Sequence, residues 1–163
     1  MKYLLIIFGL VLVGAGCVRT DGETPEAVVL NTNAQTIPAS DTTLVLRGRN
    51  LNAIPSSVFI RTDLTMLDLS GNALTGAPQA EIGRLLNLVE LNLSNNQLTG
   101  LPAELGRLKQ LQVLDVSNNR LTGLPLELGE LTQLRILDIS GNPYSMQDLD
   151  QIASKLTGTD IRR

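Results

Sequence analysis

Aliphatic residues recur along most of the chain at a fixed spacing, and over short stretches they alternate with polar ones. Leu91-Asn92-Leu93 is one such stretch, with the alternation of a half-buried β-strand. The same pattern begins at Leu64, Leu88, Leu111 and Leu134, at offsets of 24, 23 and 23 residues. One strand cannot bury its apolar face alone, so we expect the copies to stack into a parallel sheet with a continuous aliphatic core behind it.

A second motif follows each strand. Leu74-Thr-Gly-Ala-Pro78 is matched by Leu-Thr-Gly-Leu-Pro in the next two copies, and a weaker copy ends at Ile54-Pro55. An asparagine lies between the two motifs in each near-complete copy: Asn72, Asn96, Asn119 and Asn142. An amide side chain both donates and accepts, so a column of them can satisfy the backbone groups left unpaired where the chain turns inward. We therefore predict a structural asparagine ladder.

Over residues 41–144 these motifs resemble the leucine-rich-repeat family in its typical 23-residue form, LxxLxLxxNxLxxLP. The resemblance implies an α/β solenoid with a curved parallel β-sheet of about five repeats. In that family, partners usually lie on the concave face, which is formed by the outward residues of the strands. The corresponding candidates here are Met66, Asp68, Glu90, Asn92, Val113, Asp115, Ile136 and Asp138.

These candidates form two columns with different chemistry. Asp68, Asp115 and Asp138 belong to an acidic column that could attract a basic peptide or a cation. The same residues can equally be what the repeat prefers at this position, because a solvated acidic column needs no partner. The other column, Met66, Glu90, Val113 and Ile136, differs from repeat to repeat. Such differences usually carry specificity, so this column is the better candidate.

Both ends of a solenoid need caps, because an open end exposes core and unpaired strand. Ser145 and Asp148 have the spacing of a capping box, and the apolar residues after them have helical spacing. We expect a short helix over 146–156 within a C-terminal cap and tail spanning 145–163. Residues 28–40 are expected to form an N-terminal cap or a degenerate repeat. On the convex turns, Glu81/Arg84 and Glu104/Arg107 could form exposed ion pairs.

The first 17 residues have the layout of a secretory signal. Lys2 precedes an apolar run, and the segment ends in Gly14-Ala-Gly-Cys17. This end resembles the lipobox of bacterial lipoproteins, although Gly14 stands where that family usually has Leu. The resemblance implies lipidation of Cys17, a tether over 18–27, and anchoring in the bacterial cell envelope, in the outer leaflet or the outer membrane. Ordinary secretion after cleavage at Ala15 is the alternative.

Composition narrows the function classes. The chain has no His, a single Cys, 2% aromatic residues and a formal charge of -3. Metal, cofactor and nucleic-acid sites therefore lack their usual residues, and acid–base catalysis would fall to carboxylates alone. We expect that the protein is not an enzyme. We expect instead a monomeric, membrane-anchored module that binds a protein or peptide on its concave face. The alternative is a structural envelope protein without a dedicated ligand.

Overall fold

The computed structural model describes residues 29–30, 36–37 and 41–163. The predicted signal peptide, the tether and Cys17 lie outside the described residues. For clarity we call residues 41–63, 64–87, 88–110 and 111–133 repeats 1 to 4. These bounds follow the recurring leucines that begin at Leu64.

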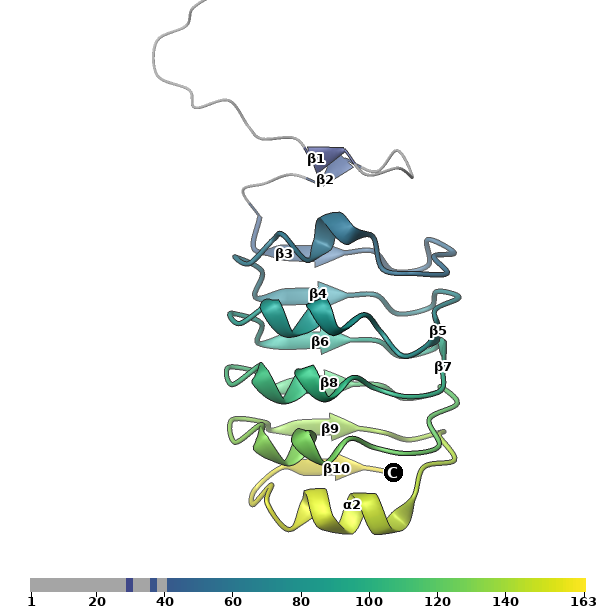
Figure 1. Ribbon diagram of the computed structural model, residues 1–163, viewed down its shortest axis with the longest axis vertical. Helices are drawn as coiled ribbons and strands as arrows, with labels where there is room; N and C mark the ends of the chain where they lie inside the picture. Colours follow the sequence, from purple (N-terminus) through teal and green to yellow (C-terminus); the bar gives the residue numbers. More distant parts are fainter. Residues whose placement is uncertain (1–28, 31–35, 38–40) are drawn as a thin grey trace, which may run out of the picture.

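The repeats build one six-stranded parallel sheet in the order β10-β9-β8-β6-β4-β3 (Figure 1). Neighbouring strands pair in register, so that Leu67 lies opposite Leu91 and Leu91 opposite Leu114. The strands are β3 (Thr43–Val45), β4 (Met66–Asp68), β6 (Glu90–Asn92), β8 (Val113–Asp115), β9 (Ile136–Asp138) and β10 (Asp160–Arg162). A second, two-stranded parallel sheet joins β5 (Thr75–Gly76) to β7 (Gln97–Leu98). The expected parallel solenoid sheet is confirmed.

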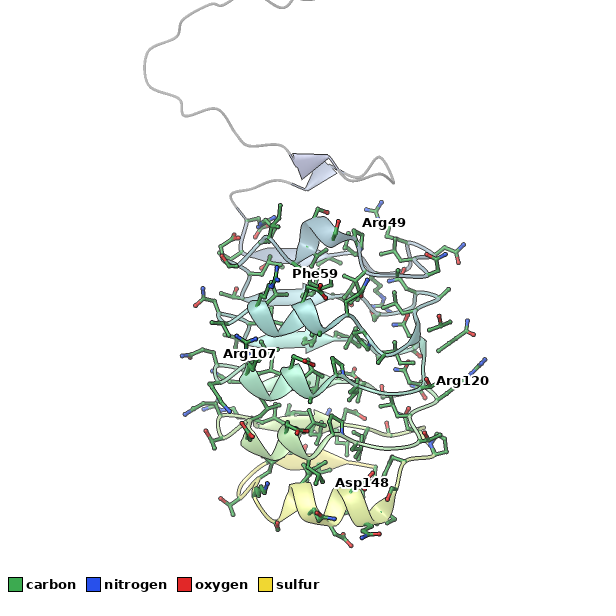
Figure 2. The ribbon with its side chains drawn as sticks, viewed as in Figure 1. Arg49, Phe59, Arg107, Arg120 and Asp148 are labelled. Atoms are coloured by element: carbon green, nitrogen blue, oxygen red, sulfur yellow. The ribbon has the colours of Figure 1, made fainter. Side chains whose placement is uncertain are left out.

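The other side of the molecule consists of short 3-10 helices, one per repeat (Figure 1). They are η1 (Ser56–Val58), η2 (Ala80–Arg84), η3 (Ala103–Arg107) and η4 (Leu126–Glu130). Apolar side chains fill the space between the sheet and these helices (Figure 2). Leu67, Leu91 and Leu114 are fully buried there. Complete burial of such a side chain stabilises the fold by about 1.5–3 kcal/mol.

The asparagine side chains connect each repeat to the one before it. Asn96 Nδ2 donates to the carbonyls of Leu69 (3.1 Å) and Leu93 (3.0 Å), and Asn96 Oδ1 accepts from the Leu74 N–H (3.1 Å). Asn72, Asn119 and Asn142 make equivalent bonds. Each amide therefore bonds backbone groups of two successive repeats, which holds the turns after the strands in register.

The last residues close the C-terminal end in two steps. Helix α2 (Met146–Ala153) packs against η4, and the Ser145 hydroxyl caps it by accepting from the Asp148 N–H at 3.3 Å. The helix ends three residues before the predicted position 156. The chain then turns at Gly158 (φ 97°) and returns as β10 beside β9. The tail that we expected after the helix is thus the sixth strand of the sheet.

The N-terminal end is built differently. β1 (Val29–Leu30) and β2 (Thr36–Ile37) pair antiparallel in a sheet of their own. The four described residues of the expected cap or degenerate repeat (28–40) therefore do not form a strand of the parallel sheet. Repeat 1 also carries a buried cation, Arg61, at the position where repeats 2 to 4 have leucine. Arg61 donates to the Asp41 carbonyl and to both carboxylate oxygens of Asp63.

Candidate functional site: the outward face of the sheet

The eight candidate residues lie on one face of the sheet, which we call the concave face. Within each of the strands β4, β6, β8 and β9, the central residue is buried and its two neighbours are half-buried and point outward. Because the strands are in register, the neighbours form two straight columns. One column contains Met66, Glu90, Val113 and Ile136, and the other contains Asp68, Asn92, Asp115 and Asp138.

Every side chain of the second column is tied to its own turn. The Oδ1 atoms of Asp68, Asp115 and Asp138 accept the backbone N–H of the serine two residues later, at 2.9, 2.9 and 3.1 Å. Asn92 accepts from Ser94 in the same way. These bonds end the strand and begin the inward turn, which is a common use of Asp and Asn. The acidic column thus has a structural role, and one oxygen of each carboxylate is committed to it.

The first column offers the more varied surface. Met66, Val113 and Ile136 present apolar surface that the sheet leaves half-exposed, and Glu90 interrupts it with a charge. None of the hydrogen bonds among the described residues commits the Glu90 carboxylate to the fold. This column can therefore contact a partner through apolar side chains and one carboxylate without losing structural bonds.

Strand β10 adds a charged border that the repeat pattern did not predict. Asp160 lies opposite Ile136 and Arg162 opposite Asp138, and the two side chains form an ion pair at 3.1 Å. The only basic side chain on the described part of the second column is thus Arg162. The signal in the sequence was weak, because Asp160-Ile161-Arg162 contains a single apolar residue.

Three serine side chains next to these columns are too deeply buried to contact a partner. Ser70, Ser94 and Ser117 follow the strands but are buried, with exposed fractions of 3%, 4% and 7%. Ser94 Oγ donates to Asn92 Oδ1 at 2.7 Å, whereas Ser70 Oγ is buried without a hydrogen-bond partner. The serine side chains therefore belong to the turns and not to the binding surface.

The convex side carries a different ion pair from those expected. Neither Glu81/Arg84 nor Glu104/Arg107 is paired among residues 41–163. Instead Lys109 reaches Glu130 of the next repeat at 2.9 Å, and this contact lowers the pKa of the Glu130 carboxyl. Both side chains are more than half exposed, so the pair contributes little to stability.

Two features are absent from the described residues. No helix in this part of the chain has the length and apolar character needed to span a bilayer. Within the same residues, no group of three or more His, Cys, Asp or Glu side chains is arranged to hold a metal ion.

Comparison with solved structures finds the same architecture in a bacterial protein and in plant proteins. A Leptospira interrogans LRR protein superposes with a TM-score of 0.65 at 41% identity, covering 69% of this chain and 28% of that one. The ectodomain of the Arabidopsis thaliana receptor kinase GASSHO1/SCHENGEN3, solved in complex with CASPARIAN STRIP INTEGRITY FACTOR 2, gives 0.60 at 34% identity, covering 68% and 13%. The BIR3–SERK2 complex of the same plant gives 0.59 at 31% identity, covering 86% and 77%.

Curated sequences match over shorter stretches. An uncharacterised leucine-rich repeat-containing protein of Schizosaccharomyces pombe is 49% identical over 51 residues, which is 31% of this chain and 8% of that protein. An adenylate cyclase of Podospora anserina is 44% identical over 52 residues, or 32% of this chain and 2% of the cyclase. This chain thus spans less than a tenth of either relative. The family described as "Leucine-rich repeat region" matches residues 43–157, and the chain belongs to the leucine-rich-repeat family.

Proposed function

We propose that this chain is a binding module for a protein or peptide, and that the partner lies on the concave face. The observation that carries the proposal is the first column, where the apolar side chains of Met66, Val113 and Ile136 are half-exposed. The solved ectodomains with the same fold support it, since two of them were determined as complexes with another polypeptide. A sheet of this kind provides a rigid surface for recognition and brings no catalytic group with it, so we propose a binding protein and not an enzyme.

The width of the sheet limits the partner. Six strands at about 4.8 Å spacing give a surface of roughly 25 Å, which suits an extended peptide or the edge of a single domain. Apolar contact with the first column and hydrogen bonding to the free carboxylate oxygens of the second would together fix its orientation. The Asp160–Arg162 ion pair forms the charged border of this surface at its C-terminal end.

A comparison of variants tests the surface. We expect affinity capture from cell-envelope fractions to recover a specific partner, and Val113→Arg with Ile136→Arg to abolish the recovery. Arginine at the exposed positions Thr132 and Gln133, in the turn between η4 and β9, is the matched control, because it adds the same charge outside the two columns. Equal recovery by both double variants would refute a role for the concave face.

We further propose that the module is held in the bacterial cell envelope by lipid on Cys17, with residues 18–27 as its tether. The proposal rests on the sequence Gly14-Ala-Gly-Cys17 after an apolar run. Two or three acyl chains would anchor the protein stably, whereas one would not. Mass spectrometry of the mature N-terminus tests it: a diacylated or triacylated Cys17 is expected, and an unmodified chain beginning at Gly16 would contradict it.

A further inference from the structure

The 3-10 helices of repeats 2, 3 and 4 are packed so closely that only glycine fits at one position. A Cβ atom on Gly83 would lie 2.8 Å from the Glu104 carbonyl oxygen, and one on Gly106 would lie 2.6 Å from that of Glu127. Repeat 1 has Phe59 at the equivalent position. Accordingly η2, η3 and η4 pack one against the next, while η1 stands apart from η2 (Figure 1).

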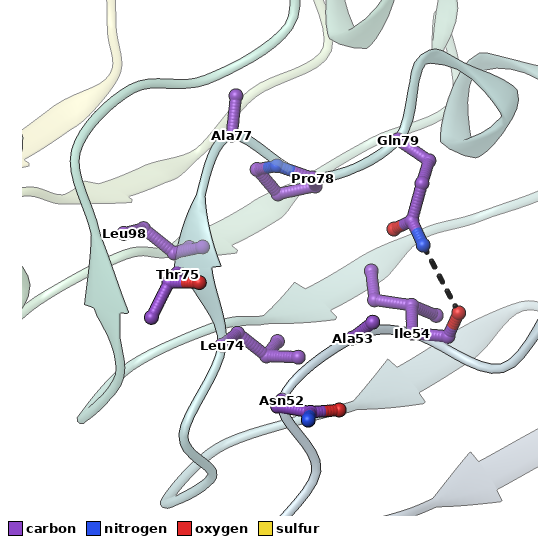
Figure 3. A pocket seen from close by; sticks show the side chains of 9 residues that line it. All are labelled: Asn52, Ala53, Ile54, Leu74, Thr75, Ala77, Pro78, Gln79 and Leu98. Atoms are coloured by element: carbon purple, nitrogen blue, oxygen red, sulfur yellow. Dashed lines mark hydrogen bonds between the residues drawn. The ribbon is translucent and has the colours of Figure 1, made fainter.

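Two further departures from the repeat occur at the same boundary. Repeat 2 has Ala77, which is exposed, where the other repeats have the buried side chains Ile54, Leu101 and Leu124. Repeat 2 also has one additional residue between Pro78 and Glu81. In this stretch Gln79 reaches across the boundary and donates to the Ile54 carbonyl at 3.1 Å (Figure 3).

These departures leave two adjoining cavities between repeats 1 and 2. One, of about 240 Å³, is lined mainly by Ile54, Leu74, Ala77, Pro78 and Leu98 (Figure 3). The other, of about 320 Å³, is lined by Phe59, Ile60 and polar residues of η2. Gln79 lines both cavities, and we call the two together the repeat 1–2 groove. Each volume is near or below the lower limit of pockets for whole small molecules and suits a single large side chain.

The rim of this groove carries charges that the fold does not use. Glu81 and Arg84 line the second cavity, both are exposed, and neither forms an ion pair with another described residue. Beside them, Ile60 is 63% exposed, the largest exposed fraction among the large apolar side chains of the described residues. The next boundary has the same charges, Glu104 and Arg107, but its glycine closes the space between the helices.

We propose that the repeat 1–2 groove is a second binding site, on the opposite side of the molecule from the concave face. Its occupant is a peptide segment of another protein that inserts a bulky aliphatic or aromatic side chain and has an acidic and a basic residue beside it. The apolar walls receive the side chain, Arg84 pairs with the acidic residue, and Glu81 pairs with the basic one. Both charges are available for this purpose because no residue of repeat 1 neutralises them.

A displayed library of random peptides, selected on the full chain, tests this site. We expect the enriched peptides to share one large apolar residue with Asp or Glu and Lys or Arg close to it. Fluorescence anisotropy with one such peptide should show binding about tenfold weaker or worse when its large residue is replaced by alanine. Enrichment of peptides without this combination would overturn the proposed chemistry.

Variants locate the site. Ala77→Leu restores the side chain of the other repeats and should reduce peptide binding about tenfold or more while the domain stays folded. Glu81→Ala with Arg84→Ala should also weaken binding, whereas the matched pair Glu104→Ala with Arg107→Ala should leave it unchanged. Val113→Arg with Ile136→Arg should also leave it unchanged, which separates this site from the concave face. Equal binding by the wild type, Ala77→Leu and the Glu81/Arg84 variant would overturn the proposal.

Discussion

The boundary between repeats 1 and 2 and the boundary between repeats 3 and 4 share the spacing of their core leucines but pack differently. At the 3–4 boundary, Gly106 lets two 3-10 helices come into direct backbone contact, and the leucines beneath them are fully buried. At the 1–2 boundary, Phe59 stands in the glycine position and Ala77 in a leucine position, and two cavities remain. Both boundaries keep the sheet pairing and the asparagine bonds. The strand pairing is therefore the same at both boundaries, whereas the packing of the 3-10 helices differs and leaves cavities at the 1–2 boundary.

The largest expected difference between interior and terminal repeats concerns the core leucines. Leu114→Ala should lower the free energy of unfolding by about 2–5 kcal/mol, because its side chain is fully buried between two repeats. Leu44→Ala should cost clearly less, because Leu44 lies in the terminal strand of the sheet and retains some exposure. Urea unfolding of both variants measures the difference. Equal losses would show that repeat 1 is packed as tightly as the interior.

The glycine position gives the second test. Gly106→Ala should destabilise the protein by about 1–3 kcal/mol, because its Cβ would overlap the backbone of Glu127 and force η3 and η4 apart. Gly100→Ala is the matched control, since its Cβ would come no closer than 4.0 Å to the nearest atom, Ala77 Cβ. Thermal unfolding of the two variants should therefore show a large decrease in Tm for the first and little change for the second. A similar Tm for both would contradict the close packing of the helices.

The repeat pattern predicted the sheet well and its ends poorly, and the reason is physical. Residues such as Leu91 and Leu114 contact copies of themselves, so their spacing alone predicts which strands pair. Asp160–Arg162 has no such spacing, and its place as a sixth strand depends on the turn at Gly158 and on pairing with β9. The pattern also placed the candidate residues on one face. The turn bonds of Asp68, Asp115 and Asp138 were missed, although the Asp-x-Ser spacing is typical of such turns.

The groove between repeats 1 and 2 was not predicted for a different reason. Phe59 and Ala77 are both apolar, so they leave the hydrophobic pattern intact. Only their side-chain volumes depart from the repeat. Phe59 is larger than the glycine found at its position in the other repeats, and Ala77 is smaller than the leucine or isoleucine found at its position. Volume affects packing between neighbours, and its effect depends on distances that a sequence pattern does not contain.

Filling the cavity at this boundary should have a moderate, stabilising effect. Ala77→Leu should raise the free energy of unfolding by about 0.5–2 kcal/mol, because it adds apolar contacts where the other repeats already have them. Ala103→Leu serves as a control, since Ala103 is exposed at the start of η3 and lines neither of the two cavities. Chemical denaturation of both variants should show a gain for the first alone. A loss of stability in Ala77→Leu would mean that the space cannot accept the side chain.

The smallest expected effect contrasts the Arg61–Asp63 ion pair within repeat 1 with the Lys109–Glu130 pair between repeats 3 and 4. Hydrogen bonds from Arg61 lower the pKa of the Asp63 carboxyl, and hydrogen bonding to Lys109 lowers that of Glu130. When the pKa of a carboxyl is lower in the folded state than in the unfolded state, the ionised carboxyl stabilises the protein at pH values above its unfolded-state pKa. This contribution disappears as the pH falls through the folded-state pKa. The stabilisation by Asp63 should therefore be complete near neutral pH and should be lost below about pH 4.

The exposure of the basic partner decides whether the Asp63 pair or the Glu130 pair contributes more to stability. The Arg61 side chain is 6% exposed and that of Lys109 is 53% exposed, so water screens the second pair far more. Asp63→Asn should remove no more than about 1 kcal/mol of stability at pH 7, because Asp63 itself is 45% exposed. It should also flatten the loss of stability between pH 5 and about 2, measured by urea unfolding across that range. Glu130→Gln should change the same curve less. If the Asp63→Asn curve ran parallel to that of the wild type, the Asp63 carboxylate would contribute nothing to the stability of the fold.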